Sequence, residues 1–112
     1  MNIEVAEERD NGVLVLLPVG RLDSANARTF ESIIMDHIGN GEQHLIVDFS
    51  RLAFISSSGM RVLLIAAKRL NASKGKLVLC EMQDHIHEVF HISGFDQIIP
   101  ILDSRQSATA VF

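Results

Sequence analysis

Short apolar runs alternate with amphipathic segments along most of this chain, and that alternation is the strongest constraint on its fold. Continuous runs rich in Val, Leu and Ile are typical of strands buried on both faces of a sheet. Such runs occur at residues 13–19, 45–47 and 76–80. Strands that alternate with helices form a mostly parallel sheet covered by helices. The sequence therefore predicts an α/β fold.

Three amphipathic helices lie between or after these runs. The first should begin after Asp23 or Ser24, either of which can cap it, and end before residues 39–41. The second is expected over residues 59–73, and the third over residues 84–92 with Asp84 as its cap.

The two ends of the chain complete the predicted sheet. Residues 3–8 form an edge strand, joined to the next by an Asp10-Asn11-Gly12 turn that is typical of a hairpin. Residues 98–99 predict a last strand, and Asp103 or Ser104 should cap a final helix. The order β-β-α-β-α-β-α-β-α then gives a mixed sheet of four or five strands with about four helices, and the hairpin supplies the antiparallel pair.

Composition excludes several classes of function. The 112 residues are the size of one domain, 1–112, and 47% of them are hydrophobic, which supplies a core. A net charge of −4 argues against nucleic acid and anionic lipid as partners. No apolar run is long enough for membrane insertion, and the N-terminus lacks the pattern of a signal peptide. With one cysteine and no disulfide, we expect a cytoplasmic protein.

Three serines and a glycine, Ser56 to Gly59, stand at the predicted start of the second helix. Serines before a helix are commonly caps. The unpaired N–H groups at a helix start can also stabilise a phosphate, which adds about −1.5 to −2 charges to a neutral surface. Since no glycine stands two places before any of these serines, the segment is not the elbow of a catalytic serine.

The second helix itself carries a mixed surface. Its core stripe is predicted at Met60, Leu63, Leu64, Ala67 and Leu70, with Val62 and Ala66 expected to be buried beside it. Ile65 lies outside that stripe, near the basic residues Arg61 and Lys68. An apolar residue among cations suits a protein–protein interface.

Several segments together resemble the STAS domain, and more narrowly the bacterial anti-sigma factor antagonists. They are Gly20-Arg21-Leu22-Asp23, Leu45-Ile46-Val47-Asp48-Phe49-Ser50, Phe54-Ile55-Ser56-Ser57-Ser58-Gly59-Met60 and Val89-Phe90-His91-Ile92-Ser93-Gly94-Phe95. The resemblance covers nearly the whole chain in order, and the serine segment is its most specific part.

The resemblance implies a switch between partners. In such proteins, the serine before the glycine is phosphorylated by an anti-sigma factor that is also a serine kinase of the histidine-kinase-like ATPase type. The unphosphorylated form binds that kinase and releases its target, phosphorylation abolishes binding, and a serine phosphatase restores it. The implied phosphoacceptor is Ser58, with Ser57 as the second choice, and Asp23 matches an acidic position near it. The partner-binding residues implied are Asp23, Ser56, Ser57, Ser58, Gly59, Met60, Arg61 and Ile65.

One position departs from the family pattern. The family commonly has an aspartate two places before the acceptor serine, where this chain has Ser56. The change takes away a carboxylate that could contact the kinase or its nucleotide and metal. A second interpretation is a STAS subunit that binds the ATPase of a membrane transporter complex without being phosphorylated.

A rival enzyme hypothesis comes from His87-Glu88-Val89-Phe90-His91, which matches the H-E-x-x-H pattern of zinc peptidases. The predicted helix is short, no further histidine follows at the required spacing, and Ile86, Val89 and Phe90 explain the helix as a cover for the core. We therefore expect no metal, no cofactor and no catalytic residue, and stoichiometric zinc lost on His87→Ala would overturn that interpretation.

Overall fold

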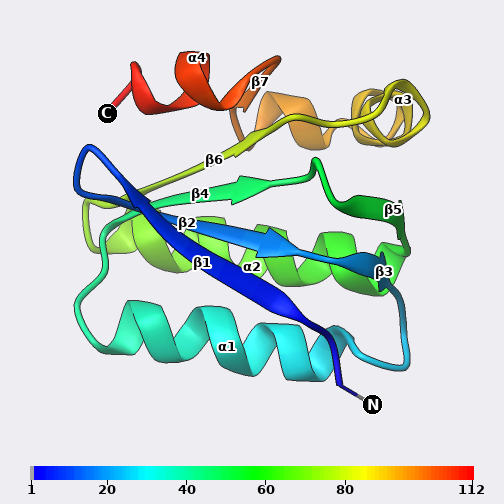
Figure 1. The fold of residues 1–112 in the computed structure, drawn as a ribbon, viewed down its shortest axis with the longest axis horizontal. Coiled ribbons are helices and arrows are strands. Elements are labelled where there is room, and N and C mark those ends of the chain that lie inside the picture. The colour runs from blue at the N-terminus through cyan, green and yellow to red at the C-terminus, as the bar shows by residue number, and fades with distance from the viewer. Residues whose placement is uncertain (1) are drawn as a thin grey trace.

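The main sheet of the computed structural model, which describes residues 2–112, has five strands in the order β1-β2-β4-β6-β7 (Figure 1). The strands are β1 (Val5–Asp10), β2 (Val13–Pro18), β4 (His44–Asp48), β6 (Lys76–Cys80) and β7 (Ile101–Leu102). Only β1 runs antiparallel to its neighbour. Asn11 and Gly12 have φ angles of 54° and 82°, which close the tight hairpin turn before β2. The predicted mixed α/β sheet is confirmed.

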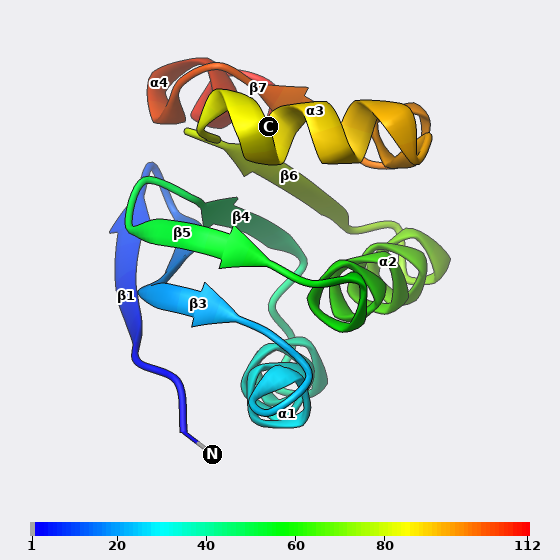
Figure 2. The ribbon, with the colours of Figure 1, turned by 90° about the vertical axis from the view of Figure 1, so that its right-hand side faces the viewer.

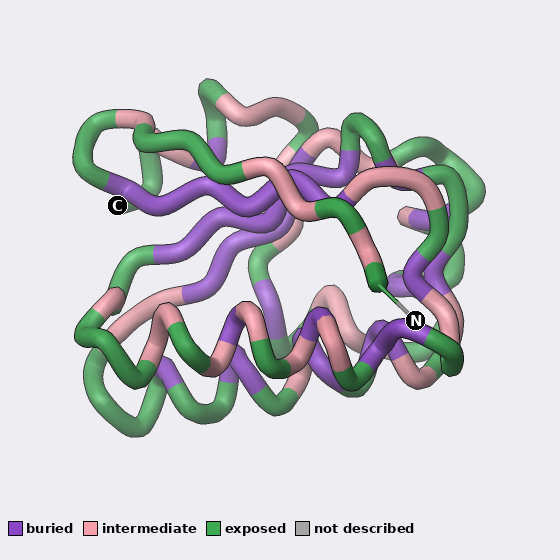
Figure 3. The backbone as a smooth tube through the Cα atoms, turned by 60° about the horizontal axis from the view of Figure 1, so that its bottom comes forward, coloured by how far each residue is buried: buried purple, intermediate pink, exposed green. Residues whose placement is uncertain are grey.

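Two long helices cover one face of this sheet, α1 (Ala27–Gly39) and α2 (Ser57–Ala72). Successive side chains along a strand point to opposite faces of the sheet. Leu14 and Leu16 of β2 therefore join the core beneath these helices, while Val13 and Val15 point to the opposite face. On that second face Ala108 of α4 (Arg105–Thr109) packs on the strands. Figure 3 shows the result: the central strands β2, β4 and β6 are buried along most of their length, and the helices are buried on one side only.

A second sheet of two short parallel strands, β3 (Gly20–Leu22) and β5 (Leu52–Ile55), lies beside the first. Neither strand was predicted as a separate element. Figure 2 shows them side by side, with β3 leading into α1 and β5 leading into α2. The serine segment therefore directly follows β5, which separates it from the buried strand β4 that ends at Asp48.

Helix starts and the last strand required further corrections. α1 begins at Ala27 with Asn26 as its cap, so neither Asp23 nor Ser24 caps it. The side chain of Asp23 instead accepts a hydrogen bond from Ala25 N–H, which makes a turn ahead of the helix. The third helix, α3 (Asp84–Ile92), has the predicted bounds, but Gln83 holds the cap position. A 3₁₀ turn, η1 (Phe95–Gln97), follows it and moves the last strand from the predicted 98–99 to β7.

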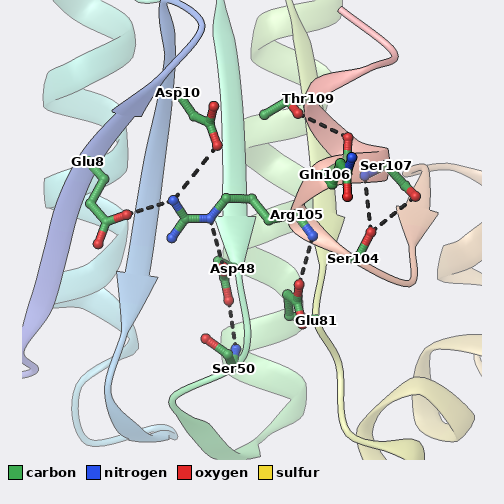
Figure 4. Close-up of polar contacts among 10 residues, drawn as sticks. All are labelled: Glu8, Asp10, Asp48, Ser50, Glu81, Ser104, Arg105, Gln106, Ser107 and Thr109. Atoms are coloured by element: carbon green, nitrogen blue, oxygen red, sulfur yellow. Dashed lines mark hydrogen bonds and ion pairs between the residues drawn. The ribbon is translucent and has the colours of Figure 1, made fainter.

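The carboxyl end of β4 holds a structural ion-pair cluster around Arg105 (Figure 4). Asp48, whose side chain is 4% exposed, receives Arg105 Nε at 3.2 Å and Ser50 N–H at 2.8 Å. The same guanidinium reaches Glu8 at 2.6 Å, and Arg105 N–H donates to Glu81. Ser104, one of the two residues predicted as candidates, caps α4. This cluster fixes the C-terminal helix on the sheet, so Asp48 serves the scaffold.

Cys80 is fully buried at the end of β6, where burial raises the pKa of its thiol to about 12. The thiol therefore stays protonated and acts as a small core residue. Within residues 2–112, every helix is too short or too polar to cross a membrane.

Candidate functional site

The start of α2 is held by hydrogen bonds from both sides. Ser56 N–H donates to the carbonyl of Leu22 at 2.8 Å, which ties the end of β5 to the end of β3. Ser56 is extended, and its hydroxyl accepts a hydrogen bond from Gly59 N–H at 3.3 Å. This is the geometry of a helix cap. Of the three serines, Ser56 is therefore the one whose side chain is committed to the fold.

Gly59 brings the first turn of α2 against the two short strands. A Cβ atom at this position would lie 2.8 Å from Leu22 Cγ and 2.9 Å from Ile55 Cγ1. Real Cβ atoms do not approach other carbons so closely, because the atoms would overlap. The absence of a side chain thus sets how near the serines lie to β3, and explains why a glycine follows Ser58.

The first turns of α2 present a few of the predicted partner-binding residues and bury others. Ser57 and Arg61 are exposed, Ser58 is half-buried, and Ile65 is 39% exposed. Gly59 and Met60 were expected to contact a partner but are buried, because they face β3, β5 and the core. They shape the surface from beneath. Val62 and Ala66 are buried, as predicted.

A groove of about 430 Å³ separates the starts of α1 and α2. Ser57, Ser58, Arg61 and Ile65 lie along it, so the structure brings four of the predicted residues together. Its other lining residues are Ser24, Ala27, Arg28, Glu31 and Val62.

Sequence reasoning missed the contribution of α1 to this groove. Arg28 and Glu31 are three residues apart, and therefore share one side of that helix, but nothing in the sequence indicated that this side faces α2. The only sequence signal for this contribution was weak. It was a charged pair, Arg28 and Glu31, close to Ala27 on a helix whose buried residues face the core.

Asp23 lies beside the groove and does not line it. Its Oδ1 accepts from Ala25 N–H at 2.9 Å, and its own N–H donates to the Asn26 side chain at 2.9 Å. Arg21 Nε approaches its other oxygen at 3.9 Å. Asp23 thus organises the turn between β3 and α1, next to Leu22, which receives the Ser56 hydrogen bond.

An exposed cation–aromatic pair extends this surface across the small sheet. The Arg21 guanidinium lies 4.2 Å from the centre of the Phe54 ring, which is 37% exposed. Because β3 and β5 pair in parallel, these two side chains come together at Arg21↔Phe54 in the register. The pair places an exposed aromatic ring and a cation on the strands that lead into the two helices.

The two histidines of the H-E-x-x-H segment lie away from this site, on α3. Asp84, His87, Glu88 and His91 border a separate hollow of about 310 Å³. His91 Nδ1 is paired with Asp96 at 2.7 Å. Over the 111 described positions, 2–112, no group of three or more His, Cys, Asp or Glu side chains is placed to hold a metal ion.

Known proteins resemble this chain in sequence and in fold. The sequence model of the STAS domain family matches residues 4–108. A proposed anti-sigma factor antagonist of Bordetella bronchiseptica, BtrV, is 40% identical over 110 residues, covering 98% of this chain and 95% of that protein. The anti-sigma F factor antagonist of Paenibacillus polymyxa is 28% identical, covering 96% and 93%. The crystal structure of a proposed anti-sigma factor antagonist from Thermotoga maritima superposes with a TM-score of 0.90 at 21% identity, covering 95% and 92%.

Proposed function

Because the chain belongs to the STAS domain family, among the anti-sigma factor antagonists, we propose that it works as a switch between partners controlled by phosphorylation of Ser58. The family consists of non-enzymatic regulators, which leaves the zinc-peptidase hypothesis without support. The unphosphorylated form binds an anti-sigma factor that is also a serine kinase of the histidine-kinase-like ATPase type, and thereby releases a sigma factor or other regulator. A serine phosphatase reverses the modification.

The position of the Ser58 hydroxyl carries this proposal. Ser58 lies in the first turn of a capped helix, on the groove, and its hydroxyl has no hydrogen-bond partner among residues 2–112. The Ser56 oxygen is instead engaged as the cap of α2, where it accepts a hydrogen bond from Gly59 N–H. A phosphate on Ser58 enters a surface that must be close and dry in a complex, and desolvation and repulsion then weaken binding.

The groove residues and the neighbouring turn form the proposed docking surface. Ile65 supplies an apolar contact and Arg61 a cation, while Asp23 and the Arg21–Phe54 pair extend the surface around the serines. Ser56 in place of the family's aspartate keeps the cap, since both residues cap helices well, and changes only the charge.

Intact-mass measurement after incubation with the kinase encoded in the same genome and ATP tests the proposal. We expect a gain of one phosphate, which Ser58→Ala abolishes and Ser57→Ala retains. Ser58→Ala should bind the kinase with or without ATP, and Ser58→Asp should bind at least about tenfold more weakly, or about 1.4 kcal/mol. Modification that persists in Ser58→Ala would refute the assignment. No mass gain, together with tight binding to a transporter ATPase, would replace it with the transporter-subunit function.

A further inference from the structure

Two arginines from different helices line the groove that contains Ser58. Arg28 is on the first turn of α1 and Arg61 on the second turn of α2, and both are exposed. Within residues 2–112 neither makes an ion pair or a hydrogen bond with its side chain, whereas Arg9 and Arg105 both bind carboxylates. The groove therefore holds two guanidinium groups free to bind an anion.

We propose that Arg28 and Arg61 bind the phosphate of Ser58 within the same chain, an inference that rests on the proposed function. Arg61 is three residues after Ser58, and side chains at this spacing are neighbours on a helix surface. Arg28 reaches the same groove from across it. Guanidinium groups donate paired N–H bonds that match the oxygens of a phosphate, and charge-assisted bonds of this kind are among the strongest in proteins.

The charges of the groove show what this capture does. Among residues 2–112, the charged side chains that line it are Arg28, Arg61 and Glu31, which gives a formal charge of +1 before modification. A phosphate of about −1.5 to −2 reverses that sign locally. The whole chain, already at −4, changes far less in proportion.

Capture adds a second action to repulsion. In the unphosphorylated chain the two arginines are available to acidic groups of a partner. Once bound to the phosphate, they are withdrawn from those groups while the groove becomes negative. One modification thus removes favourable contacts and adds unfavourable ones on the same surface. The difference in partner affinity between the two forms is therefore larger than a phosphate that faces solvent would produce.

The ³¹P NMR titration of a chain with phosphoserine installed at position 58 during synthesis tests this capture without any kinase. An unperturbed phosphoserine loses its second proton with a pKa near about 6. Two nearby cations favour the dianion, so we expect this pKa to be lower by about one unit in the folded chain than in an unfolded peptide of the same sequence. Arg28→Gln and Arg61→Gln should each raise it part of the way back. Arg69→Gln, an exposed arginine on α2 outside the groove, should leave it unchanged.

Two results would overturn the capture. One is a phosphate that titrates like the peptide. The other is a lowered pKa that neither arginine variant raises, which would assign the whole effect to the helix N-terminus. Circular dichroism of each variant checks that the fold is retained, which we expect because both arginines are exposed. Failure of the kinase to modify Ser58 would instead refute the proposed function and leave this titration unchanged, so the two failures are distinguishable.

Discussion

Gly59→Ala should destabilise the protein, although alanine is normally the better residue in a helix. A Cβ at Gly59 would lie 2.8 and 3.0 Å from Leu22 Cγ and Cδ2, and 2.9 Å from Ile55 Cγ1. Leu22 is 1% exposed and its Cγ is a branch point, so it has no free space into which to move. Overpacking of this kind costs about 1–3 kcal/mol, and the upper half of that range applies because both neighbours are confined. Replacing glycine by alanine inside a helix returns about 1 kcal/mol.

The net loss expected in the free energy of unfolding is therefore about 1–2 kcal/mol. Urea unfolding followed by circular dichroism measures this loss. The dependence of the free energy of unfolding on urea concentration should be the same in both variants if only stability has changed. Gly39→Ala is the matched control, since Gly39 also lies in a helix, α1, and a Cβ there would meet nothing within 4 Å. We expect that control to equal or exceed the parent in stability. If Gly59→Ala were as stable as Gly39→Ala, the close approach of α2 to the small sheet could not be the reason for the glycine.

Three further predictions concern the scaffold around the site. Ser56→Ala should lower the free energy of unfolding by about 1 kcal/mol in thermal denaturation, whereas Ser56→Asp should not, because aspartate also caps helices. Arg105→Met should lower it by about 2 kcal/mol in urea, since it leaves Asp48 buried without its cation, while Arg69→Met on exposed α2 surface should change it by less than about 0.5 kcal/mol. Cys80, with a thiol pKa raised to about 12, should react with a thiol reagent at pH 8 only after urea is added. Because its folded pKa is raised, stability should also fall as pH rises above the ordinary thiol value of 9.0.

Periodicity and turn chemistry predicted most of the scaffold. The buried strand β6 is apolar from Leu77 to Cys80, and the Asn11-Gly12 turn leaves few alternatives to a hairpin. The third helix was predicted with its observed bounds because its apolar spacing ends at Ser93-Gly94, where Gly94 takes a left-handed conformation. These features depend on residues close in sequence, which is why the sequence alone could indicate them.

The small sheet could not be predicted in the same way. β3 has three residues, one of them glycine, and its pairing with β5 joins segments about thirty residues apart. Neither strand has enough alternation to be recognised alone. The first cap was mispredicted because Asp23 and Asn26 both suit a helix start. The structure distinguishes them by contacts in the turn before the helix, where Asp23 accepts from Ala25 N–H and Asn26 Nδ2 donates to the Arg21 carbonyl. The resemblance to a family identified the serines, but not Arg28, which lines the same groove from α1.

The small sheet also brings the starts of α1 and α2 together into one site. Strands β3 and β5 run in parallel, so the chain leaves both at the same edge and continues into α1 and α2 side by side. The Ser56 hydrogen bond to Leu22 and the close approach of Gly59 then fix how the first turns of the two helices are placed. Arg28 and Ser58 therefore line one groove although thirty residues separate them. A change that loosens the β3–β5 pair should thus weaken the proposed contact of a Ser58 phosphate with Arg28 before the proposed contact with Arg61, which shares a helix with Ser58.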